Sequence, residues 1–204
     1  MKSLVLAFMF IVLSVGLFAQ KKKTQFPENR YFIGTSAFIL INLVPDQQNP
    51  PGFFQLNFGY WFTQKDVISV EAITWKYNAP LGIPYGDSFD NPDESYPGYV
   101  RSFGIGMAYQ RYLWKKMYVA GHALPLLQQY NHENDKAMNG FQLFLTLRLG
   151  YHISLFKDHF FIEPSVAFTH WPVNTNVPDD FAQKESQWPD YFLFEPGLHC
   201  GFKF

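Results

Sequence analysis

The chain has 204 residues, of which 20% are aromatic and only 16% are charged, and its formal net charge is −1. This length predicts one domain, and the charged fraction lies below the roughly one quarter that is usual in soluble domains, so the composition favours a lipid environment over water. No basic stripe is present beyond Lys21 to Lys23, which argues against a nucleic-acid partner, and the single cysteine, Cys200, excludes a disulfide framework within the chain.

The first 19 residues have the pattern of a secretory signal peptide. A short basic start at Lys2 is followed by an apolar run from Leu4 to Phe18 and by the small residue Ala19. The apolar run is too short to serve as a membrane-spanning helix. We therefore expect a signal peptide over residues 1–19, cleavage after Ala19, a short periplasmic segment over residues 20–29, and one domain over residues 30–204.

The rest of the chain alternates between apolar residues and small or polar residues in segments of about ten. Leucine occupies every second position from Leu143 to Leu149, opposite a row that includes Arg148. This alternation is typical of strands with one face in lipid and the other in a lumen. In the fifth segment the register stays open, because the parity that turns His122 inward turns Gly121 and Pro125 toward lipid. The eight predicted strands cover Tyr31 to Leu43, Phe53 to Phe62, Val67 to Tyr77, Val100 to Tyr112, Tyr118 to Tyr130, Gln142 to Ile153, Phe160 to Trp171, and Tyr191 to Phe204.

The predicted connections fall into two alternating classes. Three short turns cover residues 63–66, 113–116 and 156–159, whereas four longer loops cover residues 44–52, 78–98, 131–140 and 172–190. Short periplasmic turns and long outer loops are typical of outer-membrane barrels. The sequence thus predicts an all-β fold, an eight-stranded antiparallel up-and-down transmembrane β-barrel with meander topology, in the outer membrane among lipids and lipopolysaccharide.

Aromatic residues gather near the predicted strand ends, where girdles at the two membrane interfaces are expected. The residues assigned to these girdles are Tyr60, Trp61, Tyr112, Trp114, Tyr130, Tyr151 and Trp171. In the last strand, one outward row is predicted to contain Phe192, Phe194, Pro196, Leu198, Cys200, Phe202 and Phe204.

A secreted soluble barrel is the competing interpretation of the alternation. Such a barrel would turn a heavily charged face toward water. The second face here is instead small and neutral, for example Ser102, Gly104, Gly106, Ala108 and Gln110. This contrast favours a membrane barrel.

Eight strands enclose an interior that side chains can fill, which predicts a packed or narrow lumen instead of a diffusion pore. Charged groups in such an interior must be paired to offset their desolvation. If the turn after the sixth strand centres near Phe156 and Lys157, Glu163 faces Gly150 and reaches Arg148, so an Arg148–Glu163 ion pair is expected. The alternative role of these groups is a gated proton or ion path. The predicted polar network of the lumen consists of Glu71, Arg148, Glu163, Glu195 and His199.

With its leader, its eight alternating segments and its terminal Phe204, Phe202 and Leu198 on one row, the chain resembles the small outer-membrane barrels that include the OmpA transmembrane domain and the OmpW-like proteins. The resemblance covers nearly all of the mature chain and rests on pattern. It implies that Phe202 and Phe204 form a membrane-insertion signal read by the barrel-assembly machinery. It carries over no ligand site.

The architecture also resembles the outer-membrane lipid A deacylases, and this likeness implies a catalytic histidine at the outer end of the seventh strand. His170 occupies that place. The family carries His-x-Ser-Asn, whereas Pro172 stands at the serine position here, so Thr175 would have to supply the hydroxyl, beside Asn174. A lipid-modifying hydrolase is therefore retained as the alternative function.

Acidic residues gather in the second loop, at Asp87, Asp90, Asp93 and Glu94, without the spacing of a known calcium loop. We interpret them as solvated loop residues. No metal or other cofactor is expected. The main prediction is a non-enzymatic barrel with a structural or interaction role in the envelope, or one that binds or passes a small hydrophobic molecule.

Overall fold

The computed structural model describes residues 29–45, 50–82, 95–132 and 137–204. The expected signal peptide, its cleavage site at Ala19, nearly all of the 20–29 segment and the four acidic residues of the second loop lie outside the described residues.

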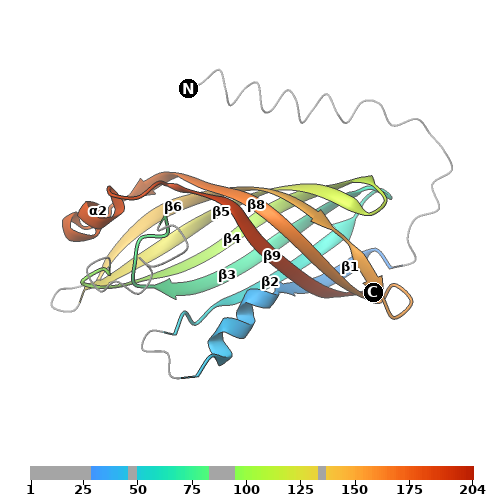
Figure 1. Cartoon of the computed structure of the whole chain (residues 1–204), viewed down its shortest axis with the longest axis horizontal. Coiled ribbons are helices and arrows are strands. Elements are labelled where there is room, and N and C mark those ends of the chain that lie inside the picture. The colour runs from blue at the N-terminus through green and yellow to red at the C-terminus, as the bar shows by residue number, and fades with distance from the viewer. Residues whose placement is uncertain (1–28, 46–49, 83–94, 133–136) are drawn as a thin grey trace, which may run out of the picture.

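Antiparallel strands form a closed ring whose members cross the barrel obliquely (Figure 1). Each strand pairs with its sequence neighbour, and the pairing of β1 with β9 closes the ring. β7 continues β6 beyond His152, and both pair with β8. The two segments therefore act as one strand, and the barrel wall has eight strands. The predicted eight-stranded meander is confirmed. The strands are β1 (Tyr31–Ser36), β2 (Phe54–Trp61), β3 (Asp66–Tyr77), β4 (Gly98–Trp114), β5 (Met117–His132), β6 (Met138–Tyr151), β7 (Ile153–Leu155), β8 (Phe160–Thr175) and β9 (Tyr191–Lys203).

The first strand is shorter than predicted, because β1 ends at Ser36 and the 3-10 helix η2 (Ala37–Leu43) follows it. The hydroxyl of Ser36 accepts a hydrogen bond from the backbone N–H of Phe38, which starts the helix. The side-chain amide of Asn42 then takes the place of backbone partners from a neighbouring strand. It donates a hydrogen bond to the carbonyl of Phe53 at 2.6 Å and accepts one from the N–H of Phe53 at 2.8 Å. These local bonds compete with the strand ladder that apolar alternation predicts.

Because β1 is short, few residue pairs join it to its two neighbouring strands. β1 is held by four residue pairs to β2 and by five to β9, whereas β3 and β4 share twelve. Beyond the pair of Ser36 with His199, the outer part of β9 from Tyr191 to Leu198 has only β8 as a ladder partner among the described residues.

The wall has an apolar outer face and a mostly polar or aromatic inner face. Ile105 and Leu127 are 69% and 67% exposed on the outside, whereas Ser102 and Gln142 are fully buried inside. The predicted direction of the apolar rows is therefore confirmed. In β5 the open register is settled by Tyr118, which is buried in the lumen on the same row as His122, so Gly121 and Pro125 face outward.

No helix in the described parts of the chain is long and apolar enough to cross a membrane.

Two details of the predicted pattern are wrong, and the first results from a register shift between β8 and β9. The pairing of β8 with β9 shifts between Ala167 and Thr169, and Phe194 takes a left-handed φ of 57°. Phe192 therefore packs inside the barrel against Trp171, with ring centroids 5.1 Å apart, and does not share the outward row of Phe194. Four expected girdle residues also pack inside the barrel: Trp61, Tyr112, Tyr130 and Trp171.

Candidate functional site

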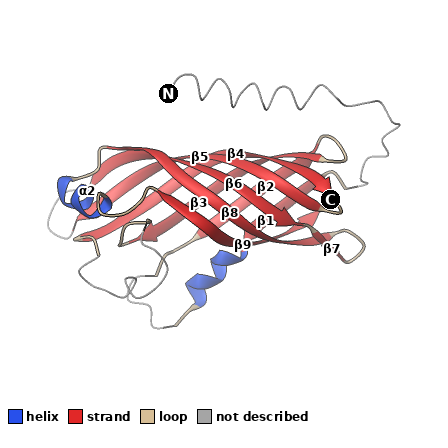
Figure 2. Ribbon diagram, turned by 45° about the horizontal axis from the view of Figure 1, so that its top comes forward, coloured by secondary structure: helices blue, strands red, loops and turns tan. Residues whose placement is uncertain are grey.

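We call the end of the barrel with the long connections the loop end, and the end with the short β2–β3, β4–β5 and β7–β8 turns the turn end. Helix α2 (Asp179–Glu185), in the connection between β8 and β9, covers the lumen at the loop end (Figure 2). Phe181 on this helix is completely buried and packs against the rings of Tyr96 and Tyr130, at centroid distances of 4.6 and 5.3 Å. Asp180 lies 2.8 Å from Nε2 of His132, and Glu185 accepts a hydrogen bond from the hydroxyl of Tyr96. The helix is thus held as a lid over this end.

Burial of the lid changes the acid-base properties of its two bonded groups. Burial raises the pKa of Glu185 above its usual range, although the hydrogen bond from Tyr96 opposes this shift. Burial, together with the nearby Glu185 carboxylate, raises the pKa of Tyr96. Burial thus favours the neutral forms of Glu185 and Tyr96, whereas the hydrogen bond between them favours the ionised Glu185 carboxylate.

Neutral amides and aromatic rings fill the lumen below the lid. Gln128 donates through Nε2 to Gln142 Oε1 at 2.9 Å and to the hydroxyl of Tyr77 at 2.8 Å, and it accepts from Tyr130 at 2.6 Å. The next layer is an apolar cluster centred on Leu126, Phe144 and Trp171. These layers leave the loop-end half of the lumen closed.

Charged groups lie deeper, around an internal cavity of about 30 Å³. Nδ1 of His122 lies 3.0 Å from Glu71 Oε1, which indicates that this nitrogen carries the proton. A cavity of this size holds one or two water molecules. Four members of the predicted polar network line it, namely Glu71, Arg148, Glu163 and His199; the fifth, Glu195, instead accepts a hydrogen bond from Thr169 at 2.6 Å.

Glu163 and Arg148 do not form the predicted ion pair. Glu163 lies 2.6 Å from Nδ1 of His152 and accepts from Gln110 at 3.2 Å, whereas Arg148 donates to the hydroxyl of Ser165 at 2.9 Å. The cause is the position of the turn after β7.

Leu155 pairs with Phe160, so this turn centres between Lys157 and Asp158, one residue later than assumed. A displacement of one residue in a turn centre moves each pairing partner by two, and Gly150 therefore faces Ser165 instead of Glu163.

The residues of the alternative hydrolase site are not brought together. His170 is half-buried on the outer face, and its Nδ1 lies 2.9 Å from the carbonyl oxygen of Asp190. On β6, the partners of His170 and Thr175 are Leu145 and Phe141, four residues apart, which is about 13 Å along a strand. The third residue, Asn174, instead accepts a hydrogen bond from Tyr130 inside the barrel. Among the described residues, no three His, Cys, Asp or Glu side chains are grouped so that they could hold a metal ion.

The two residues of the predicted insertion signal lie on the outer face near the turn end. Phe202 and Phe204 are both half-exposed, and the backbone of Phe204 forms two hydrogen bonds with that of Tyr31.

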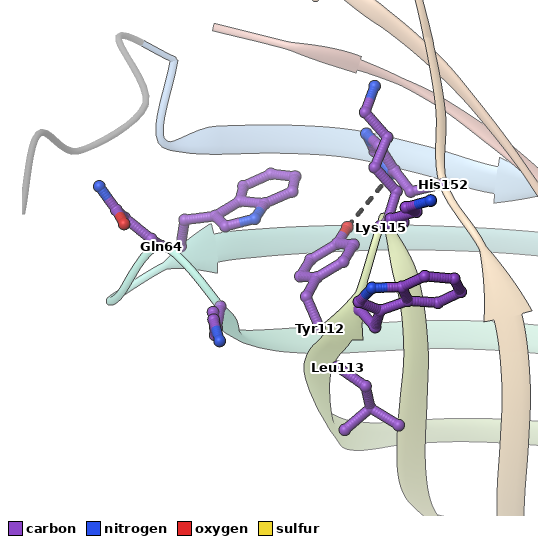
Figure 3. Close-up of a pocket in the computed structure, with 9 residues that line it drawn as sticks. Gln64, Tyr112, Leu113, Lys115 and His152 are labelled. Atoms are coloured by element: carbon purple, nitrogen blue, oxygen red, sulfur yellow. Dashed lines mark hydrogen bonds between the residues drawn. The ribbon is translucent and has the colours of Figure 1, made fainter.

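A separate, open pocket of about 300 Å³ lies at the turn end, between the β2–β3 and β4–β5 turns (Figure 3). The hydroxyl of Tyr112 is 3.2 Å from Nδ1 of His152 in its wall. Sequence reasoning missed this pocket, and its only signal was the presence of lysine in the short turns. The lining residues are Trp61, Gln64, Lys65, Tyr112, Leu113, Trp114, Lys115, Lys116 and His152.

No known family model matches the chain, and no curated protein matches it in sequence. Among solved structures it is similar to the outer membrane protein Ail of Yersinia pestis, whose backbone structure is known in a phospholipid bilayer nanodisc. The two chains are 10% identical, and the match covers 87% of this chain and 100% of Ail, with a TM-score of 0.46. This likeness is too distant to carry an argument about activity.

Proposed function

We propose that this chain is an exported outer-membrane barrel with a closed, non-conducting lumen and a structural or interaction role in the cell envelope. The observation that carries the proposal is the filling of the lumen. The lid residue Phe181, the amide layer around Gln128 and the apolar layer around Trp171 close the loop end in succession.

The membrane location is supported by the outer face of the wall. Large apolar side chains such as Ile105, Met107, Leu127 and Leu147 are more than half exposed. A continuous apolar exterior around a closed ladder is the arrangement that hydrocarbon requires, since it leaves few backbone groups without partners. Outer-membrane lipids and lipopolysaccharide would contact this face, and the barrel-assembly machinery would read Phe202 and Phe204 during insertion.

Binding or passage of a small hydrophobic molecule through the described lumen has less support, because the cavity beside Glu71 has a volume of only about 30 Å³. A ligand role would therefore have to use a site other than this cavity. The hydrolase alternative has less support as well, because His170 is remote from Thr175 along the strand.

Single-channel recording of the purified barrel in a planar bilayer tests the proposal. We expect no unitary conductance on the nanosiemens scale from inserted protein, with insertion verified independently by the resistance of the folded band to unheated sodium dodecyl sulfate. Stable nanosiemens steps would contradict a closed lumen.

Mass spectrometry of lipid A from cells with and without the protein tests the alternative. Unchanged acylation is the expected result. A loss of one acyl chain that depends on His170 would instead establish the hydrolase.

A further inference from the structure

We infer that the pocket at the turn end binds the phosphodiester headgroup of an anionic glycerophospholipid in the inner leaflet. The pocket is defined by Lys65, Lys115 and Lys116 together with aromatic walls. The inference rests on the proposed membrane location, which places the short turns on the periplasmic side.

The charge of the pocket favours an anionic ligand. Three lysines line the pocket, and none of its lining residues is acidic. The nearby described carboxylates are bonded to groups other than the three lysines: Asp66 lies 2.8 Å from Arg111, Asp158 lies 2.9 Å from Lys203, and Glu163, behind the pocket wall, lies 2.6 Å from Nδ1 of His152.

Two of the three lysines contact neutral groups. Lys116 donates to the hydroxyl of Ser154 at 3.2 Å, and the Lys115 ammonium lies 4.5 Å from the centroid of the Trp114 ring. The pocket therefore presents positive charge that the described residues do not neutralise, and an anion is the ligand that such a site favours.

The backbone of the β4–β5 turn has an unusual conformation for two lysines. Lys115 and Lys116 both have positive φ, 44° and 71°, in the two-residue connection between Trp114 and Met117. A two-residue hairpin with both residues in this region favours Asn-Gly, because other residues are strained there. Turn geometry therefore does not by itself select two lysines at these positions, and their charge is free to serve the pocket.

Exposed apolar side chains on the pocket wall favour a lipid over free phosphate as the ligand. Leu113 and Trp114, on the same wall, are 53% and 64% exposed at the end of the apolar belt. Tryptophan is typical of the interface between headgroups and acyl chains. A ligand that contacts this wall and the lysines together carries both an apolar part and an anionic group, and in a glycerophospholipid that anionic group is the phosphodiester.

The test uses a variant that should fold at least as well as the natural protein. Lys115→Asn with Lys116→Gly removes two charges and supplies the preferred turn residues. The control is Lys157→Gln, because Lys157 also has a positive φ, 56°, in a neighbouring turn but does not line the pocket.

Bound lipid is measured by native mass spectrometry of the full barrel with equal amounts of phosphatidylglycerol and phosphatidylcholine of matched chains. We expect the natural protein and the Lys157→Gln control to prefer phosphatidylglycerol by at least tenfold. Each lysine removed should lower the preference for phosphatidylglycerol about fivefold, so the double variant should bind the two lipids almost equally.

Added inorganic phosphate should not displace the lipid. Displacement by millimolar phosphate would show a free-phosphate site and overturn the lipid assignment, as would equal lipid preference in the natural protein and the double variant. Flotation of the protein with vesicles of pure phosphatidylcholine reports the membrane location separately: failure to float contradicts the proposed function, whereas flotation without headgroup preference contradicts only this inference.

Discussion

The two halves of the lumen are closed by different kinds of interaction. Below the lid, the loop-end half contains neutral groups that exclude water by shape, among them the buried side chains of Tyr130, Phe144 and Trp171. The turn-end half contains charged groups in directional contacts, such as Glu163 with His152. Packing tolerates small shifts of its members, whereas a buried carboxylate depends on each of its few donors. The filling of the lumen should thus be more sensitive to single substitutions in the turn-end half than in the loop-end half.

The largest expected effect is that of Glu163→Ala. The substitution leaves His152 and Gln110 without their shared acceptor, and the free energy of unfolding should fall by about 3–5 kcal/mol. Denaturant titration of the barrel in micelles measures the loss. Glu195→Ala is the control: Glu195 accepts one hydrogen bond, from Thr169, and should cost about 1–2 kcal/mol. Equal losses at the two positions would show that the Glu163 cluster has no special role.

The free-energy cost of Phe181→Ala should be comparable to that of Glu163→Ala, but it should be confined to the lid. Removing this buried ring should weaken docking of the lid by about 3–4 kcal/mol. Hydrogen exchange should rise in α2 while the strands stay protected, and the bilayer should still show no conductance, because the layer around Leu126, Phe144 and Trp171 persists. Phe194→Ala, at a ring that is 80% exposed, is the matched control and should leave exchange in α2 unchanged. Opening of a pore by Phe181→Ala would show that the deeper layers do not close the barrel.

The lid should also depend on pH through Glu185. Its pKa is raised in the folded protein, so the folded state holds this proton to higher pH than the unfolded state does. Docking of α2 should therefore be most stable below the ordinary glutamate pKa and should weaken as pH rises through the raised value. Hydrogen exchange of α2 at several pH values measures this dependence, and Glu185→Gln should largely abolish it. A lid that becomes firmer with rising pH would contradict the assignment.

The smallest effect on stability is expected for Phe204→Ala, because this side chain is half-exposed on the outer face. The folded barrel should lose at most about 1 kcal/mol. Assembly in cells should nevertheless slow if the terminal phenylalanine is an insertion signal, which pulse-chase detection of the folded band can measure. Ile33→Ala, on the same outer face, is a control that should leave the assembly rate unchanged.

Alternation predicted the features that depend on period two alone. The leucine row of β6 faces outward, and Gln55, Asn57 and Glu71 face inward, as the sequence indicates. Pairing between strands depends on the turns, where an error of one residue in the β7–β8 turn gave Glu163 the wrong partner.

The sequence also contained no signal for His122 and His152, because their carboxylate partners lie 51 and 11 residues away and meet them only once the ring is closed. The bulge near Phe194 was equally hidden, since an extra residue in a strand keeps the apolar composition and changes only the parity. The turn-end pocket combines side chains of two hairpins, so no single segment revealed it.

The early end of β1 at Ser36 has a mechanical consequence. Four and five residue pairs hold this strand on its two sides, so separating it breaks far fewer backbone bonds than separating β4 from β5, which share fourteen pairs. Local opening of the barrel should begin at β1, and amide protons of β1 should exchange before those of β4.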